Sequence, residues 1–157
     1  MSSVREQVLQ AVLAKVEGVK AALSWVTAVR NPRDPLGDDQ LNALVLFDGG
    51  LLDPRGLSGG VQEDEVEFSV GLIVREKESE GLTAEALIDA GFVAIMDALL
   101  DPDDIQLGGL VECIDPRGGS DPVYGRAEKG ARVVGGLVMD FSARFMTREG
   151  DASQVGP

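Results

Sequence analysis

Two stretches of the chain place apolar residues at every second position, and each predicts a β-strand. In residues 65–75 the second face is polar apart from Ile73. The apolar face consists of Val66, Phe68, Val70, Leu72 and Val74. In residues 131–147 one face consists of Leu137, Met139, Phe141, Ala143 and Phe145. Side chains of a strand point alternately to opposite faces, so both patterns indicate an antiparallel sheet with one face against a core.

Weaker patterns predict three shorter strands. Residues 22–29 alternate, residues 41–47 are nearly all apolar, and residues 107–114 form another short apolar run. A continuous apolar run is typical of a strand covered on both faces. Within the last long strand, Gly135 and Gly136 predict a bulge or a bend.

Two segments repeat apolar residues at helical spacing. The first spans residues 3–17, where an S-x-x-E capping box begins at Ser3 and Gly18 is placed to end the helix. The second spans residues 84–100 and follows Thr83, a good N-cap residue. Its apolar side consists of Ala84, Leu87, Ile88, Gly91, Phe92, Ile95, Met96 and Leu99. Both helices are predicted to cover the apolar face of the sheet.

Residues 48–64 and 116–130 show neither the alternation of a strand nor the apolar spacing of a helix, so we predict loops there. The first holds five glycines and also leucines that a plain solvated linker would not need. Loops of this length are uncommon inside a domain and are usually functional or disordered. Two hypotheses stay open: a mobile surface loop, or a loop that becomes ordered against a partner. Its candidate interface residues are Leu51, Leu52, Arg55 and Leu57.

These elements occur in the order helix, strands, helix, strands. The order predicts an α+β fold, in which a mostly antiparallel mixed sheet has two helices packed on one face. The length of 157 residues suits a single domain, which we place at residues 1–148. Residues 149–157 are expected to form a disordered C-terminal tail.

Composition changes this picture mainly through charge. The chain carries 27 acidic and 14 basic residues, for a formal net charge of −13. A protein that binds nucleic acid neutralises phosphates with cations, so this chain is expected to repel DNA. The simpler interpretation is that the charge keeps the protein in solution. The sharper interpretation is a surface past which DNA moves without sticking.

Candidate catalytic chemistry is sparse. The chain has no histidine, which removes the commonest general base and zinc ligand. Its one cysteine, Cys113, lies in an apolar run and is expected to be a buried, inert thiol. No phosphate-binding glycine loop and no G-x-S-x-G motif is present. We therefore predict no enzymatic activity and no cofactor. The sequence also shows neither a signal-peptide pattern nor an apolar run long enough to cross a bilayer.

A cluster of aspartates follows the second helix. Asp101, Asp103 and Asp104 offer oxygen ligands of the kind that Mg²⁺ or Ca²⁺ takes, but their spacing departs from the EF-hand loop. The simpler interpretation is an exposed helix end, where a cation or a basic partner would relieve repulsion from the helix dipole. We predict no metal site and keep the three aspartates as candidate interface residues.

A succession of features carries a resemblance to a known family. In chain order they are the helix 4–16, the strands 23–29 and 41–47, the glycine-rich loop, the strand 66–74, the helix 84–100, the aspartates 101–104 and the strand 136–147. In the order, length and side-chain pattern of these elements, the chain resembles the tail terminators of long, non-contractile phage tails, the minor tail protein type that caps the tail tube. The loops 51–60 and 116–130 are longer than the family pattern.

The resemblance implies a structural virion protein. Such proteins form a hexameric ring on the end of the tail tube, stop its polymerisation and provide the head–tail joining surface. The implied partners are further copies of the chain, the tail tube protein and a head–tail connector protein, while DNA passes through the lumen without specific binding. The implied location is the host cytoplasm during assembly and then the virion. A closed ring joins two different surface patches, and an exposed edge strand is one way to join them.

Two alternatives stay open beside this hypothesis. The first is another head–tail connector or tail tube component, which would share much of this order and side-chain pattern. The weaker alternative is a small group-transfer enzyme. That enzyme would need a pocket with convergent polar groups and a carboxylate of strongly shifted pKa.

Charge reversal of Asp101, Asp103 and Asp104 to lysine is expected to alter oligomerisation more than folding, because exposed charges contribute little to the stability of a fold. Light scattering measures the solution mass, and denaturant unfolding measures stability. Unchanged ring formation in the triple variant would contradict this prediction.

Overall fold

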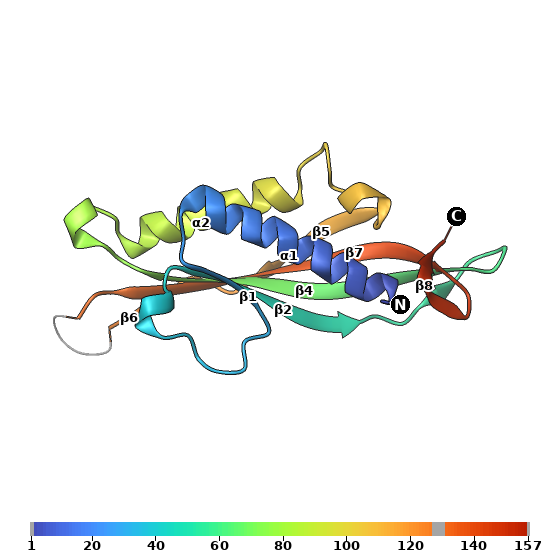
Figure 1. Ribbon diagram of the computed structural model, residues 1–157, viewed down its shortest axis with the longest axis horizontal. Helices are drawn as coiled ribbons and strands as arrows, with labels where there is room; N and C mark the ends of the chain where they lie inside the picture. The colour runs from blue at the N-terminus through green and yellow to red at the C-terminus, as the bar shows by residue number, and fades with distance from the viewer. Residues whose placement is uncertain (1, 127–130, 157) are drawn as a thin grey trace.

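The computed structural model describes residues 2–126 and 131–156 and shows two layers. One layer is a single sheet, and the other consists of two helices that lie side by side on one face of it (Figure 1). The loop that contains residues 31–42 extends away from β1 and β2, on the side opposite the helices (Figure 1). The predicted α+β fold is confirmed.

The helices are α1 (Val4–Leu23) and α2 (Ala84–Leu99), with the 3₁₀ turns η1 (Asp38–Gln40), η2 (Glu78–Glu80) and η3 (Leu107–Gly109). The first strands are β1 (Thr27–Arg30), β2 (Ala43–Leu51), β3 (Arg55–Gly56) and β4 (Val61–Arg75). The later strands are β5 (Cys113–Gly119), β6 (Val123–Gly125), β7 (Val134–Arg148) and β8 (Asp151–Val155).

The sheet is built around the pairing of β4 with β7. The main strand order is β1-β2-β4-β7-β5, with β3 paired to β4 and both β6 and β8 paired to β7. The β1–β2 pair is parallel, and the other described pairs are antiparallel. The register of β4 and β7 runs without interruption from Val61 opposite Arg148 to Arg75 opposite Val134. At roughly 3.3 Å per residue, this ladder is about 45–50 Å long.

The predicted bulge at Gly135 and Gly136 is wrong, because the register passes through both residues unchanged. Gly135 has a packing role instead. A Cβ atom at this position would lie 2.9 Å from Cδ1 of Ile88 and 3.1 Å from the ring of Tyr124. The missing side chain therefore lets α2 and β6 both approach β7.

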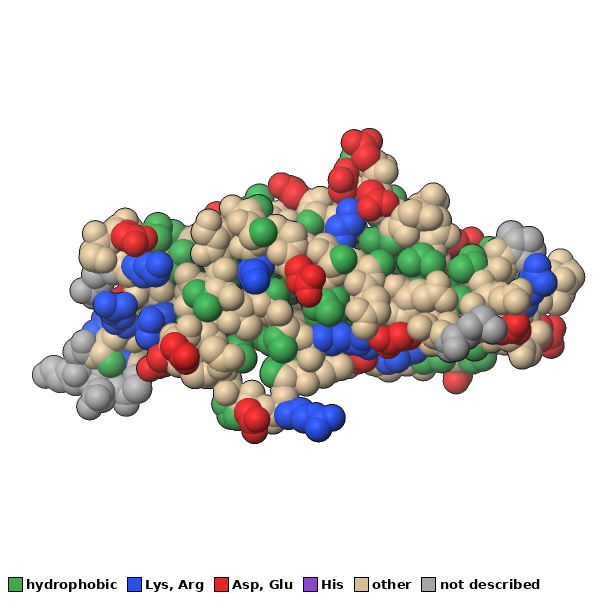
Figure 2. All heavy atoms as spheres, viewed as in Figure 1, with side chains coloured by type: hydrophobic (Ala, Val, Ile, Leu, Met, Phe, Trp, Pro, Cys, Tyr) green, Lys and Arg blue, Asp and Glu red, His purple; other side chains and the backbone are tan. Residues whose placement is uncertain are grey.

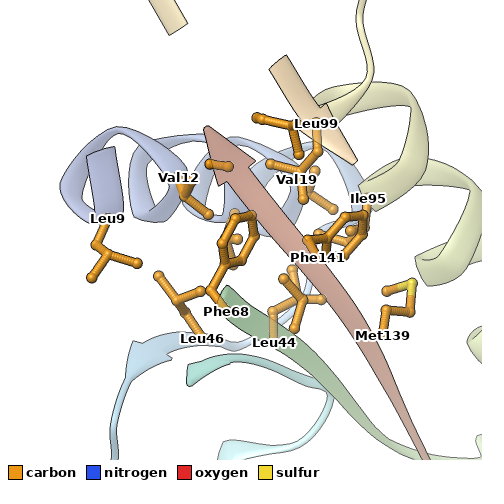
Figure 3. Packing of buried hydrophobic residues seen from close by; sticks show 14 of the residues in the cluster. Leu9, Val12, Val19, Leu44, Leu46, Phe68, Ile95, Leu99, Met139 and Phe141 are labelled. Atoms are coloured by element: carbon orange, nitrogen blue, oxygen red, sulfur yellow. The ribbon is translucent and has the colours of Figure 1, made fainter. Parts of the chain in front are cut away.

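The core lies between the sheet and the two helices. The alternation predicted for β4 is confirmed, since its five apolar side chains on the helix side are at most 1% exposed. Phe68 of β4 stacks on Phe141 of β7 with ring centroids 5.4 Å apart. Figure 3 shows the two rings surrounded by aliphatic side chains from α1, α2 and β2. Leu137 is the one member of the predicted β7 face that is only partly buried.

The N-terminal helix is longer than predicted. Its beginning is confirmed, because the Ser3 hydroxyl accepts a hydrogen bond from the backbone N–H of Glu6 at 3.1 Å. Gly18 does not end the helix, which continues to Leu23 and is capped by Ser24 in the left-handed conformation. Val19 and Leu23 extend the apolar stripe into this last turn, so the helix keeps packing on the core. The strand predicted at residues 22–29 is therefore reduced to β1.

Helix α2 begins at its predicted cap, where the Thr83 hydroxyl accepts a hydrogen bond from the N–H of Ala86. Its predicted core side is correct except at two positions. Phe92 is 40% exposed, and Met96 is only partly buried. Gly91 faces inward, and a Cβ atom there would lie 2.7 Å from the ring of Trp25. Trp25 therefore packs directly against the backbone of α2.

Three other sequence predictions need correction. The strand predicted at residues 107–114 is instead the turn η3 followed by β5, which begins only at Cys113. The loop predicted at residues 116–130 contains the end of β5 and all of β6, while residues 127–130 lie outside the described residues. The disordered tail is wrong over Asp151–Val155, which pairs with β7 as β8. Regular backbone pairing thus extends further than side-chain patterns indicate, because the ladder does not require apolar side chains.

The two helical glycines give a matched stability test. Gly91→Ala is expected to lower the free energy of unfolding by about 1 kcal/mol or more, because the new methyl group collides with Trp25. Gly18→Ala meets nothing within 4 Å and is expected to raise the free energy of unfolding by about 0.5–1 kcal/mol through helix propensity. Denaturant unfolding measures both values. Equal effects of the two variants would contradict the tight contact at Gly91.

Candidate interaction surfaces

Residues 48–61 form a β-hairpin that we call the arm. Strand β2 continues to Leu51, β3 pairs with β4, and β4 begins at Val61. The chain reverses at Gly59 and Gly60, whose φ angles of 80° and 74° favour glycine. The loop assignment of residues 48–64, left open between a mobile loop and a loop ordered by a partner, is therefore corrected: the glycines shape a turn within paired strands of the same chain.

The arm is held by the adjoining strands both at its base and at its turn. The Leu52 N–H donates to the backbone oxygen of Glu65 at 2.9 Å, and the N–H of Glu149 donates to the backbone oxygen of Gly60 at 2.8 Å. Asp64 is buried, accepting hydrogen bonds from the Thr147 hydroxyl at 2.7 Å and from the side-chain amide of Gln62 at 2.9 Å. The arm is thus an ordered projection of the sheet.

The apolar side chains of the arm remain at the surface. Leu51 is 51% exposed, Leu52 is 41% exposed and Leu57 is 36% exposed. Arg55 is also exposed and lies opposite Glu63 in the β3–β4 pair. In Figure 1 this hairpin extends beyond the helix layer at one end of the molecule. The four residues predicted as interface candidates therefore lie together on one projection, and three of them expose apolar surface to water.

An ion cluster ties the arm to α1 and β1. The guanidinium of Arg30 donates to both carboxylate oxygens of Glu6 at 2.7 and 2.9 Å, and to both oxygens of Asp48 at 2.8 and 2.7 Å. Arg5 lies 3.8 Å from the Asp48 carboxylate and donates to the backbone oxygen of Gly49 at 3.4 Å. This cluster fixes the point at which β2 enters the arm. We call it the Arg30 clamp.

The clamp shifts the titration of its carboxylates. Hydrogen bonds from Arg30 are the main cause that lowers the pKa of Glu6 from 4.5 to about 2. The same guanidinium lowers the pKa of Asp48. Both acids therefore stay ionised in the folded protein at pH values where they would be protonated in the unfolded chain.

The predicted aspartate cluster has mainly local partners. Asp104 forms a 2.7 Å ion pair with Lys15 of α1 and accepts a hydrogen bond from the N–H of Gly108, and Lys15 lowers its pKa. Asp101 accepts a hydrogen bond from the N–H of Asp103. Within the described part of the chain, the Asp103 side chain has no hydrogen-bond or ion-pair partner. Two of these three candidates thus organise the connection after α2, and Asp103 alone points to solvent.

A second exposed apolar area lies at the other end of the sheet, on β6. Val123 is 70% exposed and Tyr124 is 40% exposed. They border a hollow with a cavity volume of about 390 Å³. The remaining lining residues are Ile73, Gly125, Arg126, Val134, Gly135 and Gly136. We call this hollow the β6 pocket. Sequence analysis assigned the segment to a loop, and Val123-Tyr124 between glycine-rich stretches was the only signal for a strand there.

The side of the sheet away from the helices, over β4, β5 and β7, carries polar groups that bond to one another. Ser69 donates to Asp140 at 2.6 Å, and Arg117 bonds to Ser142 and to Glu65. These groups bond to one another across three strands. Ser69, Arg117 and Asp140 also line a hollow with a cavity volume of about 350 Å³, together with Glu67.

Cys113 is half-buried at the edge of the same side, in place of the buried position predicted for it. Its sulfur accepts hydrogen bonds from Nε and Nη2 of Arg144 at 3.2 and 3.0 Å. No group of three or more Cys, Asp or Glu side chains that could hold a metal ion occurs among residues 2–126 and 131–156.

Comparisons with known proteins leave the chain without an assigned family. No family model matches it, and no curated protein matches its sequence significantly. In the described residues, neither helix combines the length and the apolarity needed to span a membrane.

The Arg30 clamp predicts a stability loss in acid. Because the pKa of Glu6 is lowered on folding, its contribution is complete above about pH 4.5 and is lost as the pH falls towards about 2. The wild-type protein is expected to lose more unfolding free energy across this window than Glu6→Gln, measured by denaturant unfolding at several pH values. Glu17→Gln on the same helix is the control and should follow the wild type. Parallel profiles for all three proteins would contradict the role of the clamp.

Proposed function

We propose that this chain is a structural assembly protein that caps a phage tail tube as a hexameric ring. The observation that carries the proposal is the arm, an ordered projection whose three leucines are between 36% and 51% exposed. Apolar side chains grouped on a projection of a single chain are typical of protein–protein contact surfaces. The partners would be other copies of the chain, the tail tube protein and a head–tail connector.

The succession of elements supports the tail-terminator class. The chain runs through a helix, two adjacent strands, a projecting hairpin, a long strand, a second helix and a final long strand. This is the order on which the resemblance rests, with the arm in place of the expected flexible loop. The net charge of −13 also suits a ring through which DNA passes, because a polyanion does not adhere to an acidic protein.

The described surfaces favour assembly over catalysis. On the open side of the sheet, Ser69, Arg117 and Asp140 line a hollow of about 350 Å³ but are engaged in hydrogen bonds with neighbouring side chains. The β6 pocket is lined mainly by apolar and glycine residues. Acid–base or nucleophilic chemistry requires convergent polar groups poised for proton transfer. A connector or a tube subunit would use the same arm, and the assay below separates these functions.

A ring-forming cap is expected to limit tube length. Light scattering over a range of protein concentration should show a mass six times that of the monomer, either alone or after addition of tail tubes. Added to polymerising tube protein, the purified chain should shorten the tubes in proportion to its concentration, as measured by electron microscopy. Incorporation along the tube with continued growth would identify a tube subunit instead. A monomer that leaves tube length unchanged would overturn the proposal.

A further inference from the structure

The two exposed apolar areas lie at opposite ends of the β4–β7 ladder. The arm joins β4 at Val61, and the β6 pocket lies at the other end, beside Ile73 of β4 and Val134 of β7. We propose that the arm of one copy docks in the β6 pocket of the next copy. This contact rests on the proposed ring and names the two surfaces that would close it.

The length of the ladder prevents the arm from filling the pocket of its own chain. About 45 Å of continuous antiparallel pairing separates the two surfaces. A contact between them must therefore join different molecules. It is also heterologous, because the donor and acceptor patches differ, and repeated heterologous contacts generate a closed ring when the rotation between copies closes.

The β6 pocket is shaped to receive aliphatic side chains. Three of its eight lining residues are glycines, so these positions place no side chain between Ile73, Val134 and the exposed Val123. Its volume of about 390 Å³ lies within the range of pockets that bind small organic groups. Burying the exposed parts of the arm leucines there would remove apolar surface from water on both copies.

Charge also favours this pairing over a contact between two arms. Arg126 lines the pocket, and Arg75 lies directly opposite Val134 in the register. The arm and the residues beside it carry four acids and two bases. The acids are Asp53, Glu63, Glu149 and Asp151, and the bases are Arg55 and Arg148. Figure 2 shows Lys and Arg side chains gathered at the end of the molecule where β6 lies. Copies that each carry a charge of −13 repel one another, so a contact that brings acids to bases is preferred.

Cross-linking tests the contact directly. In a Cys113→Ser background, one chain carries both Leu52→Cys and Val123→Cys, and a short bismaleimide is added under conditions in which the wild type is hexameric. The expected product is a ladder of covalent species up to the hexamer. A mixture of the two single variants should give covalent dimers only. The control pair, Leu52→Cys with Val93→Cys, uses an exposed valine of α2 (48% exposed) and should stay uncoupled.

Solution mass provides an independent readout. The double variant Leu51→Glu/Leu52→Glu is expected to lose the hexamer and remain a folded monomer, because both side chains are already in contact with water. Val93→Glu is the matched control and should keep the wild-type mass. Circular dichroism checks that each variant is folded.

The outcomes separate this contact from the ring itself. A hexamer that survives Leu51→Glu/Leu52→Glu, or that gives no link between positions 52 and 123, overturns the contact and leaves the ring in place. Coupling of the single Leu52→Cys variant to itself would show an arm-to-arm dimer and also overturn the contact. A wild-type chain that is monomeric at every concentration, with and without tail tubes, overturns both proposals.

Discussion

The uninterrupted pairing of β4 with β7 is the constraint on which the rest of this molecule depends. Its ladder of about 45–50 Å is longer than either helix, since 20 residues of α1 span about 30 Å and 16 residues of α2 span about 24 Å. Helices of this length cover the middle of the sheet, where Phe68 and Phe141 stack. The ends of the long strands carry the arm and β6, where Leu51, Leu52, Leu57, Val123 and Tyr124 remain exposed.

Charged residues have two roles in this structure: some form ion pairs between elements, and the excess of acids sets the net charge. The Arg30 clamp gathers Glu6 and Asp48 from two elements around one guanidinium, at the point where the sheet leaves the core. Lys15 and Asp104 connect α1 to the segment after α2 in a similar way. The excess of acidic over basic residues gives the chain its net charge of −13. The Arg30 clamp stabilises the geometry of the arm, while the surplus acids set how the protein interacts with other polyanions.

The spacing of apolar residues along the chain predicted the elements that face the core. It predicted no strand in the glycine-rich segments. Residues 65–75 and 84–100 were predicted well, because burial on one side imposes a period of 2.0 or 3.6 residues. The arm was predicted as a loop, although its backbone is paired. Its position is set by β4 and by the distant Glu149, whose hydrogen bond to Gly60 no local pattern encodes. Phe92 was assigned to the core because its spacing fits the stripe, yet it lies at the margin of the helix–sheet contact.

The sequence by itself determined the two-layer α+β class, the caps at Ser3 and Thr83, and the excess of acidic residues, because each follows from local spacing or from composition. Only the tertiary structure decided which apolar residues stay exposed and which charges meet. Arg30 binds Glu6 and Asp48, which lie 24 and 18 residues away in the sequence. The arm and the β6 pocket lie at opposite ends of one ladder only because β4 pairs with β7. Those relations depend on the register between strands far apart in the chain, and register is a property of the packed sheet rather than of any one segment.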